Sequence, residues 1–390
     1  MNSLRHIKIL HTVAALKASS GGPSILVSSL CEELGKSGAS IEIATQDYAS
    51  EDANIVPQSA FVTMTYVPAI NFPLLRLIYT PSFGTILVNR CLETKASLIH
   101  NHGLWLMPNH AAAIVARRLK IPLMISTHGM LEPWALQYKA WKKRIAWKFY
   151  QHRDLLSASV LHATSVREAD NLRQLGFKQP IAMIPNGIHL PIWHESVKTR
   201  TENHTALFMG RIHPVKGLSE LVRAWQIARP KGWRMVIAGP DEGGHKKEVE
   251  AAIHRAGLQD VFQFAGSVEG EAKTDLYRNA DLFILPTFTE NFGIVVAEAL
   301  SYGIPVITTK GAPWEGLITH RCGWWIDIGA EPLADAIREA TAISDVERQE
   351  MGTRGRIFVE KNFGWTQIAE NMLSVYQWIL GQGSKPEYVL

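Results

Sequence analysis

Short runs of apolar residues alternate with helix-length amphipathic segments along this chain, and the alternation occurs in two rounds. In the first round, strands are expected at Ile7–Leu10, Ile41–Ala44, Leu98–Ile99, Leu123–Ser126, Val160–Ala163 and Ile181–Ile184. In the second round, they are expected at Ala206–Met209, Met235–Ala238, Phe262–Ala265, Leu282–Leu285 and Val306–Thr308. Strands that alternate with helices form parallel sheets with right-handed crossovers. The sequence therefore predicts an α/β protein with two Rossmann-like domains.

Helical periodicity separates most of these runs. Helices are expected at Pro108–Leu119, Val166–Leu175, Leu218–Ala228, His245–Ala256, Ala272–Asn279, Ile294–Tyr302 and Ile368–Leu380. The polar, proline-containing stretch Pro185–Arg200 has the composition of a linker. We expect domains at 1–188 and 189–365, followed by a closing helical segment at 366–390. Two such domains bind ligands at the carboxyl ends of their strands, in the cleft between the facing sheets.

The composition supports two packed domains. Of the 390 residues, 46% are hydrophobic and 19% are charged, which excludes disordered, collagen-like and disulfide-scaffold classes. Cys31, Cys91 and Cys322 lie far apart and form no CxxC pair, which favours reduced thiols in the cytoplasm. No apolar stretch reaches the ~18 residues of a membrane-spanning helix. Polar residues also interrupt the first apolar run, so we expect no signal peptide.

Charge is unevenly distributed. The whole chain has a formal charge of +4, but residues 1–190 carry +8 and residues 191–390 carry −4. A basic first half favours an anionic ligand or an anionic surface as its partner.

Gly21 and Gly22 follow the first expected strand and precede an amphipathic segment that reaches Leu34. Two glycines allow close approach of a backbone to a ligand, and Pro23 suits the first position of a helix, where the amides would favour a phosphate. The spacing is not the dinucleotide fingerprint GxGxxG. A phosphate-binding loop and a plain tight turn fit these residues equally well.

The segment Gly210–Leu218 follows the first strand of the second round and opens a helix. Arg211 offers a planar fork of donors and Lys216 a mobile point charge, a combination that suits a diphosphate. The alternative is a loop with two surface cations. The position beside glycines at the end of a strand favours the phosphate interpretation.

Glu290 and Glu298 flank a third strand-to-helix junction. The amides of Gly293, Ile294 and Val295 are expected at the helix N-terminus, where they would point at an anion. Glu298 lies in a mostly apolar helix, and a buried carboxylate requires polar partners, such as the hydroxyls of a ribose. Alternatively, Glu290 caps the helix and Glu298 is solvated.

His128 and Gly129 follow the expected strand Leu123–Ser126, a position suited to the cleft, although a hydrogen-bonded structural histidine also fits. His100, His102 and His110 resemble a metal cluster, but no carboxylate or cysteine completes the set, so we expect no metal site. The chain contains neither GxSxG nor GxxxxGK[ST], which disfavours a serine hydrolase and a P-loop NTPase.

The segment Trp134–Arg153 interleaves aromatic residues with six lysines and arginines and contains no acidic residue. This pattern is typical of helices that lie on anionic lipid. It equally fits an amphipathic helix that packs its aromatic side chains on the first domain. Nucleic acid is a weaker third interpretation, because no nucleic-acid-binding module accompanies the segment.

Together these motifs resemble glycosyltransferase family 4, the retaining nucleotide-sugar transferases with the GT-B fold. The most specific match is the pair Glu290 and Glu298, eight residues apart around Phe292-Gly293, followed by Arg211 and Lys216. Three more segments agree in order: Gly21-Gly22-Pro23, His128-Gly129 and Pro185-Asn186-Gly187-Ile188. The ending Phe363-Gly364-Trp365 before a helix also matches a family in which the last helix crosses back to the first domain.

The resemblance implies a donor site. Arg211 and Lys216 would hold the donor diphosphate and stabilise the leaving group, with Gly21 and Gly22 contributing backbone from the other domain. The amides of Gly293, Ile294 and Val295, next to Phe292, would contact phosphate and sugar hydroxyls.

The resemblance also implies roles around the sugar and the nucleoside. Glu290 would orient the sugar and face the developing cation, Glu298 would bind the ribose, and His128 would contact the sugar. Gly239 and Val268 would border the nucleotide. The implied catalytic set is His128, Glu290, Arg211 and Lys216, with no metal and no cofactor.

The expected activity is retaining transfer of a hexose from UDP-glucose or a related UDP-hexose, with GDP-mannose as the second choice. The expected acceptor is a glycan or a lipid-linked glycan in polysaccharide synthesis. The alternatives are a nucleotide-sugar 2-epimerase of the same architecture and a non-catalytic sugar-binding module. We expect a cytoplasmic protein, and the Trp134–Arg153 segment suggests peripheral contact with an anionic membrane and no binding of nucleic acid.

Overall fold

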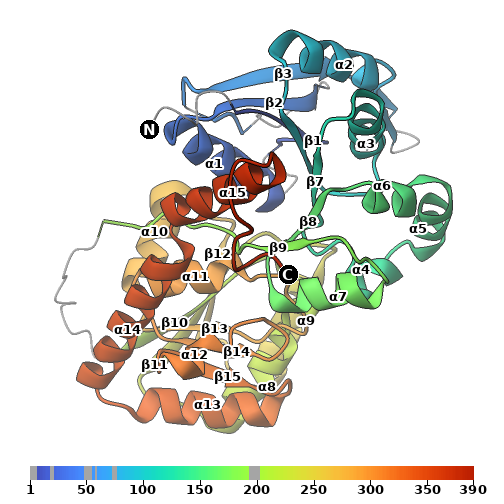
Figure 1. The fold of residues 1–390 in the computed structure, drawn as a ribbon. Helices are drawn as coiled ribbons and strands as arrows, with labels where there is room; N and C mark the ends of the chain where they lie inside the picture. Colours follow the sequence, from blue (N-terminus) through green and yellow to red (C-terminus); the bar gives the residue numbers. More distant parts are fainter. Residues whose placement is uncertain (1–6, 18–21, 48–54, 58, 73–76, 193–202) are drawn as a thin grey trace. The chain divides into compact units, whose positions relative to one another are not determined.

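A computed structural model describes residues 7–17, 22–47, 55–57, 59–72, 77–192 and 203–390. Contacts within the chain divide it into two compact units (Figure 1). The first unit comprises Met1–Gly187 together with Trp365–Leu390, and the second comprises Ile188–Gly364.

The first unit is built on a seven-stranded sheet in which every pairing is parallel. The strands are β1 (Lys8–Val13), β2 (Ser40–Asp47), β3 (Val62–Pro68), β6 (Leu98–His102), β7 (Leu123–Ser126), β8 (Val160–Ala163) and β9 (Ile181–Met183). Their order is β3-β2-β1-β6-β7-β8-β9, so the direction of strand addition reverses between β1 and β6. A separate antiparallel hairpin joins β4 (Ile70–Phe72) and β5 (Leu77–Tyr79).

Helices cover both faces of this sheet. They are α1 (Gly22–Lys36), α2 (Phe83–Thr94), α3 (Met107–Leu119), α4 (Pro133–Gln137), α5 (Ala140–Ala146), α6 (His152–Leu156), α7 (Val166–Gln174) and α15 (Trp365–Ile379). On one face, α1 and α15 lie side by side and share a core with alternate strand residues such as Ile9 (Figure 1). On the other face, α2 and α3 pack against the intervening residues, such as Leu10.

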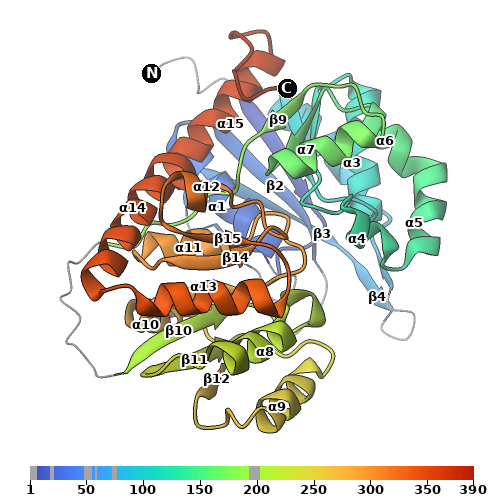
Figure 2. The same ribbon diagram turned by 90° about the horizontal axis from the view of Figure 1, so that it is seen from below.

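The second unit repeats this plan with a six-stranded parallel sheet in the order β12-β11-β10-β13-β14-β15. The strands are β10 (His204–Met209), β11 (Trp233–Ala238), β12 (Phe262–Gly266), β13 (Leu282–Leu285), β14 (Val306–Thr309) and β15 (Gly323–Ile326). The helices are η5 (Pro214–Lys216, a 3₁₀ turn), α8 (Leu218–Ala228), α9 (His245–Arg255), α10 (Gly270–Asn279), α11 (Ile294–Ser301), α12 (Gly316–Thr319), α13 (Ala330–Ala342) and α14 (Asp345–Phe363). Figure 2 shows α8 and α13 together on one face of this sheet.

These elements confirm the predicted α/β fold with two parallel sheets. Three expected strands, including Leu282–Leu285, have the bounds that their apolar runs indicate, because a central parallel strand is buried on both faces. The closing helix begins at Trp365, three residues before the expected start at Ile368. No helix in the described part of the chain is both long and apolar enough to span a membrane.

Candidate functional site

The loops that carry Arg211, Lys216 and Glu290 follow β10 and β13, the two strands between which the order of the second sheet reverses. Parallel α/β sheets bind ligands at this switch point, outside the carboxyl ends of the strands. The two loops are also joined there, because Thr287 Oγ1 and Phe288 N–H both donate to the carbonyl of Val215, at 3.1 and 2.8 Å. The topology therefore brings the two predicted motifs into contact.

Lys216 and Glu290 form an ion pair at this junction, with Lys216 Nζ donating to Glu290 Oε1. Only 12% of the lysine side chain and 16% of the glutamate side chain are exposed. Lys216 ends the 3₁₀ turn η5, where the ring of His213 accepts the N–H of Val215 at 3.2 Å. The Lys216 side chain therefore extends from a turn that His213 caps.

Glycines permit the close packing of the backbone beneath this junction. Gly217 has φ +70°, and a Cβ there would lie 2.0 Å from the carbonyl oxygen of Pro286. Gly239, predicted to border the nucleotide, has φ +142°, and a Cβ there would lie 1.9 Å from the carbonyl oxygen of Gly210. A side chain at either position would push apart the loops that follow adjacent strands.

Arg211 follows β10 but makes a different contact. Its guanidinium pairs with Glu242, and the two side chains are 54% and 47% exposed. An ion pair exposed to this extent is held weakly. The structure thus brings Lys216 and Glu290 together, and it places Arg211 in a separate, solvent-accessible pair.

Helix α11 begins directly after Gly293, which has φ +78° and occupies the N-cap position. The preceding residue, Phe292, is buried against Trp314, and its carbonyl accepts the Trp314 indole N–H at 2.6 Å. Ile294 and Val295 form the first turn, where backbone amides have no partner within a helix. The helix N-terminus is therefore fixed in place by an aromatic anchor.

Glu298 lies on the second turn of α11 and is held by two side chains of α10. Lys273 Nζ donates to Oε1 at 2.6 Å, and Tyr277 O–H donates to Oε2 at 2.8 Å. Burial first, and then the Glu298 charge, raise the pKa of Tyr277 well above its usual value. Lys273 and Tyr277 belong to an ordinary amphipathic pattern, so nothing in the sequence marked them as partners of Glu298.

Two other predicted residues, Val268 and Gly22, are placed less specifically. Val268 is half-buried in the segment between β12 and α10 and packs on the core of the second unit. Gly22 is the first residue of α1, while Gly21 lies outside the described residues.

His128 lies in the loop after β7 and has a positive φ of 48°. Its Nε2 atom lies 3.2 Å from Nδ1 of His102. Desolvation, followed by the neighbouring His162, lowers the pKa of His128 to about 4. His128 also borders a small pocket of about 20 Å³ that α1 and α15 help to line.

A row of buried histidines lies behind His128 on the α1/α15 face of the first sheet. It consists of His11 on β1, His100 and His102 on β6, and His162 on β8. Two of these, His100 and His102, belong to the set of histidines that resembles a metal cluster in the sequence. Nitrogen atoms of His11, His100 and His102 do lie within 4.8 Å of one another. Both His100 nitrogens, however, are hydrogen-bonded, to Tyr376 and Ser126, and the His100 ring packs against His102 with centroids 4.1 Å apart and ring planes tilted by 34°.

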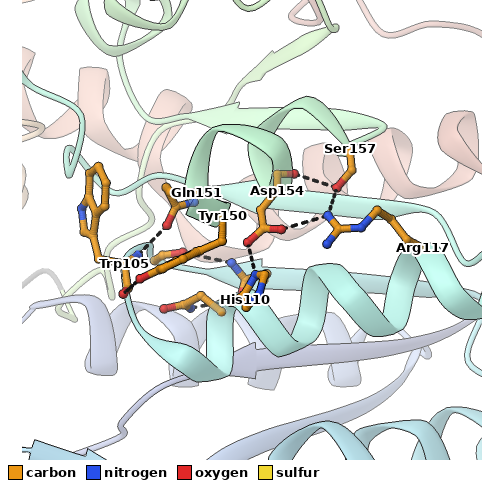
Figure 3. Close-up of polar contacts among 10 residues, drawn as sticks. Trp105, His110, Arg117, Tyr150, Gln151, Asp154 and Ser157 are labelled. Carbon is orange, nitrogen blue, oxygen red and sulfur yellow. Dashed lines mark hydrogen bonds and ion pairs between the residues drawn. The ribbon is translucent and has the colours of Figure 1, made fainter. Parts of the chain in front are cut away.

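His110, the third histidine of that resemblance, lies elsewhere. Its Nδ1–H donates to the buried Asp154 at 2.6 Å, and Arg117 Nη1 donates to the other carboxylate oxygen at 2.9 Å (Figure 3). Nearby, Gln151 accepts the N–H of Trp105 at 2.6 Å, and Tyr150 donates to the Trp105 carbonyl (Figure 3). These contacts join α3 and the preceding Trp105 to residues at, and just after, the end of Trp134–Arg153.

The basic aromatic segment, residues Trp134–Arg153, is not one continuous helix. It comprises α4, α5, a π-helical turn (Trp147–Gln151) and the start of α6. Trp147 packs on the core of the first unit, as one interpretation of the sequence required. Other apolar side chains remain exposed, however, among them Trp141 at 63% and Phe149 at 76%.

Comparison with known proteins places the chain among glycosyltransferases. The model of the glycosyl transferase 4-like domain matches residues 21–187, and that of glycosyl transferases group 1 matches residues 191–358. The D-inositol 3-phosphate glycosyltransferase of Xylanimonas cellulosilytica is 26% identical over 383 residues, which cover 91% of each chain. The GDP-mannose:cellobiosyl-diphosphopolyprenol alpha-mannosyltransferase of Xanthomonas oryzae pv. oryzae is 24% identical and covers 96% of this chain and 98% of its own.

Solved structures share the fold. Sucrose-phosphate synthase from Thermosynechococcus elongatus superposes with a TM-score of 0.75 at 20% identity, covering 96% of this chain and all of its own. Anabaena HepE, solved in complex with UDP and glucose, gives a TM-score of 0.73 at 20% identity with the same coverage. The chain is therefore a glycosyltransferase with the GT-B fold, and it belongs to the group related to family 4.

Proposed function

We propose that this glycosyltransferase moves a hexose from a nucleotide sugar to a glycan or lipid-linked acceptor in polysaccharide synthesis, with retention of the anomeric configuration. UDP-glucose or a related UDP-hexose is the first donor to test, because HepE, which has the same fold, was solved with UDP and glucose. GDP-mannose is the second, because relatives of the full length are named GDP-mannose-dependent transferases that act on a diphosphopolyprenol-linked glycan.

The observation that carries this proposal is the Lys216–Glu290 pair at the switch point of the second sheet. In the proposed reaction, Lys216 stabilises the negative charge that develops on the departing nucleoside diphosphate. A cation that Glu290 and η5 have already positioned needs no reorganisation as that charge appears. The exposed Arg211 adds a second, mobile cation to the diphosphate, and the amides of Gly293, Ile294 and Val295 supply further donors.

Glu298 would accept the ribose hydroxyls. A carboxylate offers about four acceptor positions, and Lys273 and Tyr277 occupy one on each oxygen. The remaining positions suit two adjacent hydroxyls, and the two protein donors fix the orientation of the carboxylate. Gly239 and Val268 would border the nucleoside.

Glu290 would orient the sugar and face the positive charge of an oxocarbenium-like transition state, while Phe292 supports this loop. His128 would contact the donor sugar, and Gly22, with Gly21, would add backbone contact to the phosphates. In this mechanism the leaving phosphate deprotonates the acceptor on the same face of the sugar. No metal and no cofactor take part.

The basic aromatic segment would bring the enzyme to its acceptor. Lys139 and Lys142 lie over the rings of Tyr138 and Trp141, at 4.9 and 5.5 Å from the ring centroids. Exposed rings beside lysines are suited to the headgroup region of an anionic membrane. We propose that the segment binds such a surface, at the cytoplasmic face of a membrane that carries a lipid-linked acceptor.

Product analysis tests the reaction. The enzyme is incubated with UDP-glucose, and the anomeric configuration of the freshly transferred or released glucose is read by proton NMR before mutarotation. An α-configured first product supports the proposal. An inverted product, or an epimerised sugar released without transfer, contradicts it.

A further inference from the structure

Glu168 holds the backbone on both sides of His128. One carboxylate oxygen accepts the hydroxyl of Thr127 at 2.6 Å and the N–H of Gly129 at 2.5 Å. The other accepts the N–H and the hydroxyl of Thr164 at 2.8 and 2.9 Å. Glu168 is 2% exposed, and these four donors match the full acceptor capacity of a carboxylate.

In the sequence Glu168 has the position of a helix-capping residue. Ser165 caps α7 by accepting the N–H of Glu168, which is half of a capping box. The glutamate side chain, however, extends to the His128 loop and to Thr164. A local helix signal thus conceals a tertiary contact.

The ring of His128 is held through a row of hydrogen bonds. His128 Nε2 is paired with His102 Nδ1 at 3.2 Å, and His102 Nε2 is paired with His11 Nδ1 at 2.9 Å. Among the described residues, His11 Nε2 is buried and has no partner. Burial lowers the pKa of His11 to about 3 and that of His102 well below its usual value, so each ring carries a single proton.

Two neutral-ring arrangements satisfy both hydrogen bonds. If His102 is protonated on Nδ1, then His11 carries its proton on Nδ1 and His128 carries its proton on Nδ1. If His102 is protonated on Nε2, then His11 must bury an unpaired Nε2–H, and His128 is protonated on Nε2. Orphaned buried N–H groups are rarer than unpaired acceptors, which favours the first arrangement. His128 then offers its Nδ1–H as a hydrogen-bond donor.

We propose that Glu168 and His102 are positioning residues for His128: Glu168 fixes the loop backbone, and His102, backed by His11, fixes the ring and keeps its proton on Nδ1. This inference rests on the proposed contact between His128 and the donor sugar. A ring locked as a donor at Nδ1 is suited to a sugar hydroxyl or a phosphate oxygen, and unsuited to accepting a proton there.

Nitrogen-15 NMR of the histidine rings tests the tautomer without any ligand. At neutral pH the His128 ring of the full chain is expected to be neutral with its proton on Nδ1. In His102→Leu the ring is expected to move toward the Nε2–H tautomer. In His102→Asn, whose amide nitrogen takes the place of Nδ1, the original tautomer is expected to return. An Nε2–H tautomer in the unaltered protein, or no change in His102→Leu, overturns the proposal.

His162→Gln is the matched control for this measurement. His162 is also a buried histidine of the row, but it bonds to Ser126 and to the carbonyl of Ile184, not to His128 or His102. Glutamine can accept from the serine and donate to the carbonyl. The His128 tautomer is expected to stay unchanged in this variant, and a change as large as in His102→Leu contradicts the assignment to His102.

Double-mutant analysis tests directly whether His102 and Glu168 act through His128. The rate of UDP release from UDP-glucose is the readout. His102→Leu and Glu168→Gln are each expected to lower kcat roughly 10- to 100-fold, since small misplacements of a reacting group have effects of this size. On a His128→Ala background, each is expected to add less than about twofold. Full additivity overturns the proposal. If His128→Ala itself retains normal turnover while the NMR result holds, the proposed role of His128 fails and the tautomer assignment stands.

Discussion

Lys216 and Glu290 lie 74 positions apart in the chain, and their side chains meet where the strand order of the second sheet reverses. One loop follows β10 and the other follows β13, and hydrogen bonds to Val215 join the two loops. The pair places one cation and one carboxylate, both mostly shielded from solvent, at the ligand-binding edge of a Rossmann-like sheet. We expect the lysine to stabilise the negative charge on the leaving nucleoside diphosphate and the carboxylate to face the positive charge on the sugar, as the bond between them breaks.

Replacing Lys216 or Glu290 with alanine is expected to remove most turnover while the protein stays folded. Loss of one preorganised electrostatic group typically lowers kcat by ~10²- to 10³-fold. UDP release from UDP-glucose, together with circular dichroism, measures both effects. Arg223→Ala is the control, because this exposed arginine forms its ion pair, within the described part of the chain, with Glu220 on the same helix. Near-normal turnover in either site variant would remove that residue from the mechanism.

Glu298→Ala is expected to raise KM for the donor by roughly 10-fold or more and to change kcat much less. Hydrogen bonds to a charged group contribute about 1.5–3 kcal/mol, and the ribose lies away from the reacting carbon. Lys273→Met, which removes a contact that orients Glu298, is expected to have a smaller effect in the same direction. A large loss of kcat at unchanged KM would argue that Glu298 acts on the sugar instead.

The buried histidines are expected to make the protein sensitive to acid. Burial lowers the pKa of His11 to about 3, so the folded chain keeps this ring neutral while the unfolded chain protonates it below about pH 6.5. Below that pH the unfolded state binds more protons than the folded state. The free energy of unfolding therefore decreases by about 1.4 kcal/mol for each pH unit by which the pH is lowered, for each such group. His100 and His102 have lowered pKa values and add to the same slope.

Urea denaturation between pH 7.5 and pH 4.5 measures this effect. The free energy of unfolding is expected to decrease steeply below pH 6.5, and His11→Phe is expected to make the decrease shallower. A flat profile across this range would show that the rings accept protons in the folded state.

The basic aromatic segment is expected to retain the protein on anionic vesicles at low salt. Flotation with phosphatidylglycerol-containing liposomes measures this, and Trp141→Ser combined with Phe149→Ser is expected to abolish it. Ile357→Ser, an exposed apolar residue of the second unit, is the control. Absence of wild-type binding, or equal loss in the control, would contradict the membrane proposal.

Much of the fold could be predicted because parallel strands buried on both faces appear as apolar runs. Strand β3 (Val62–Pro68) was missed because it lies at the sheet edge, where its residues are exposed or half-buried apart from the buried Val67. Helices α2 and α13 were missed as well, although each is amphipathic.

Within the candidate site, the sequence identified the loops but not their pairings. The rule for switch points places Lys216 and Glu290 at one edge of the sheet, yet only the structure shows that they touch. Arg211 was grouped with Lys216, but the structure pairs it with Glu242. Glu168 was hidden by its helix-capping position, and Tyr277 by its place in an amphipathic pattern. Such contacts join residues distant in sequence, which local patterns do not encode.

We propose that the second unit binds a nucleotide sugar through Lys216 and Glu290. A thermal-shift titration with UDP-glucose, GDP-mannose, UDP and GDP, run in parallel on the unaltered protein and on Lys216→Ala, tests it most directly. We expect one nucleotide series to raise Tm by several degrees in the unaltered protein and to have little effect on the variant. No shift with any of these ligands, or an undiminished shift in Lys216→Ala, would rule out donor binding through Lys216.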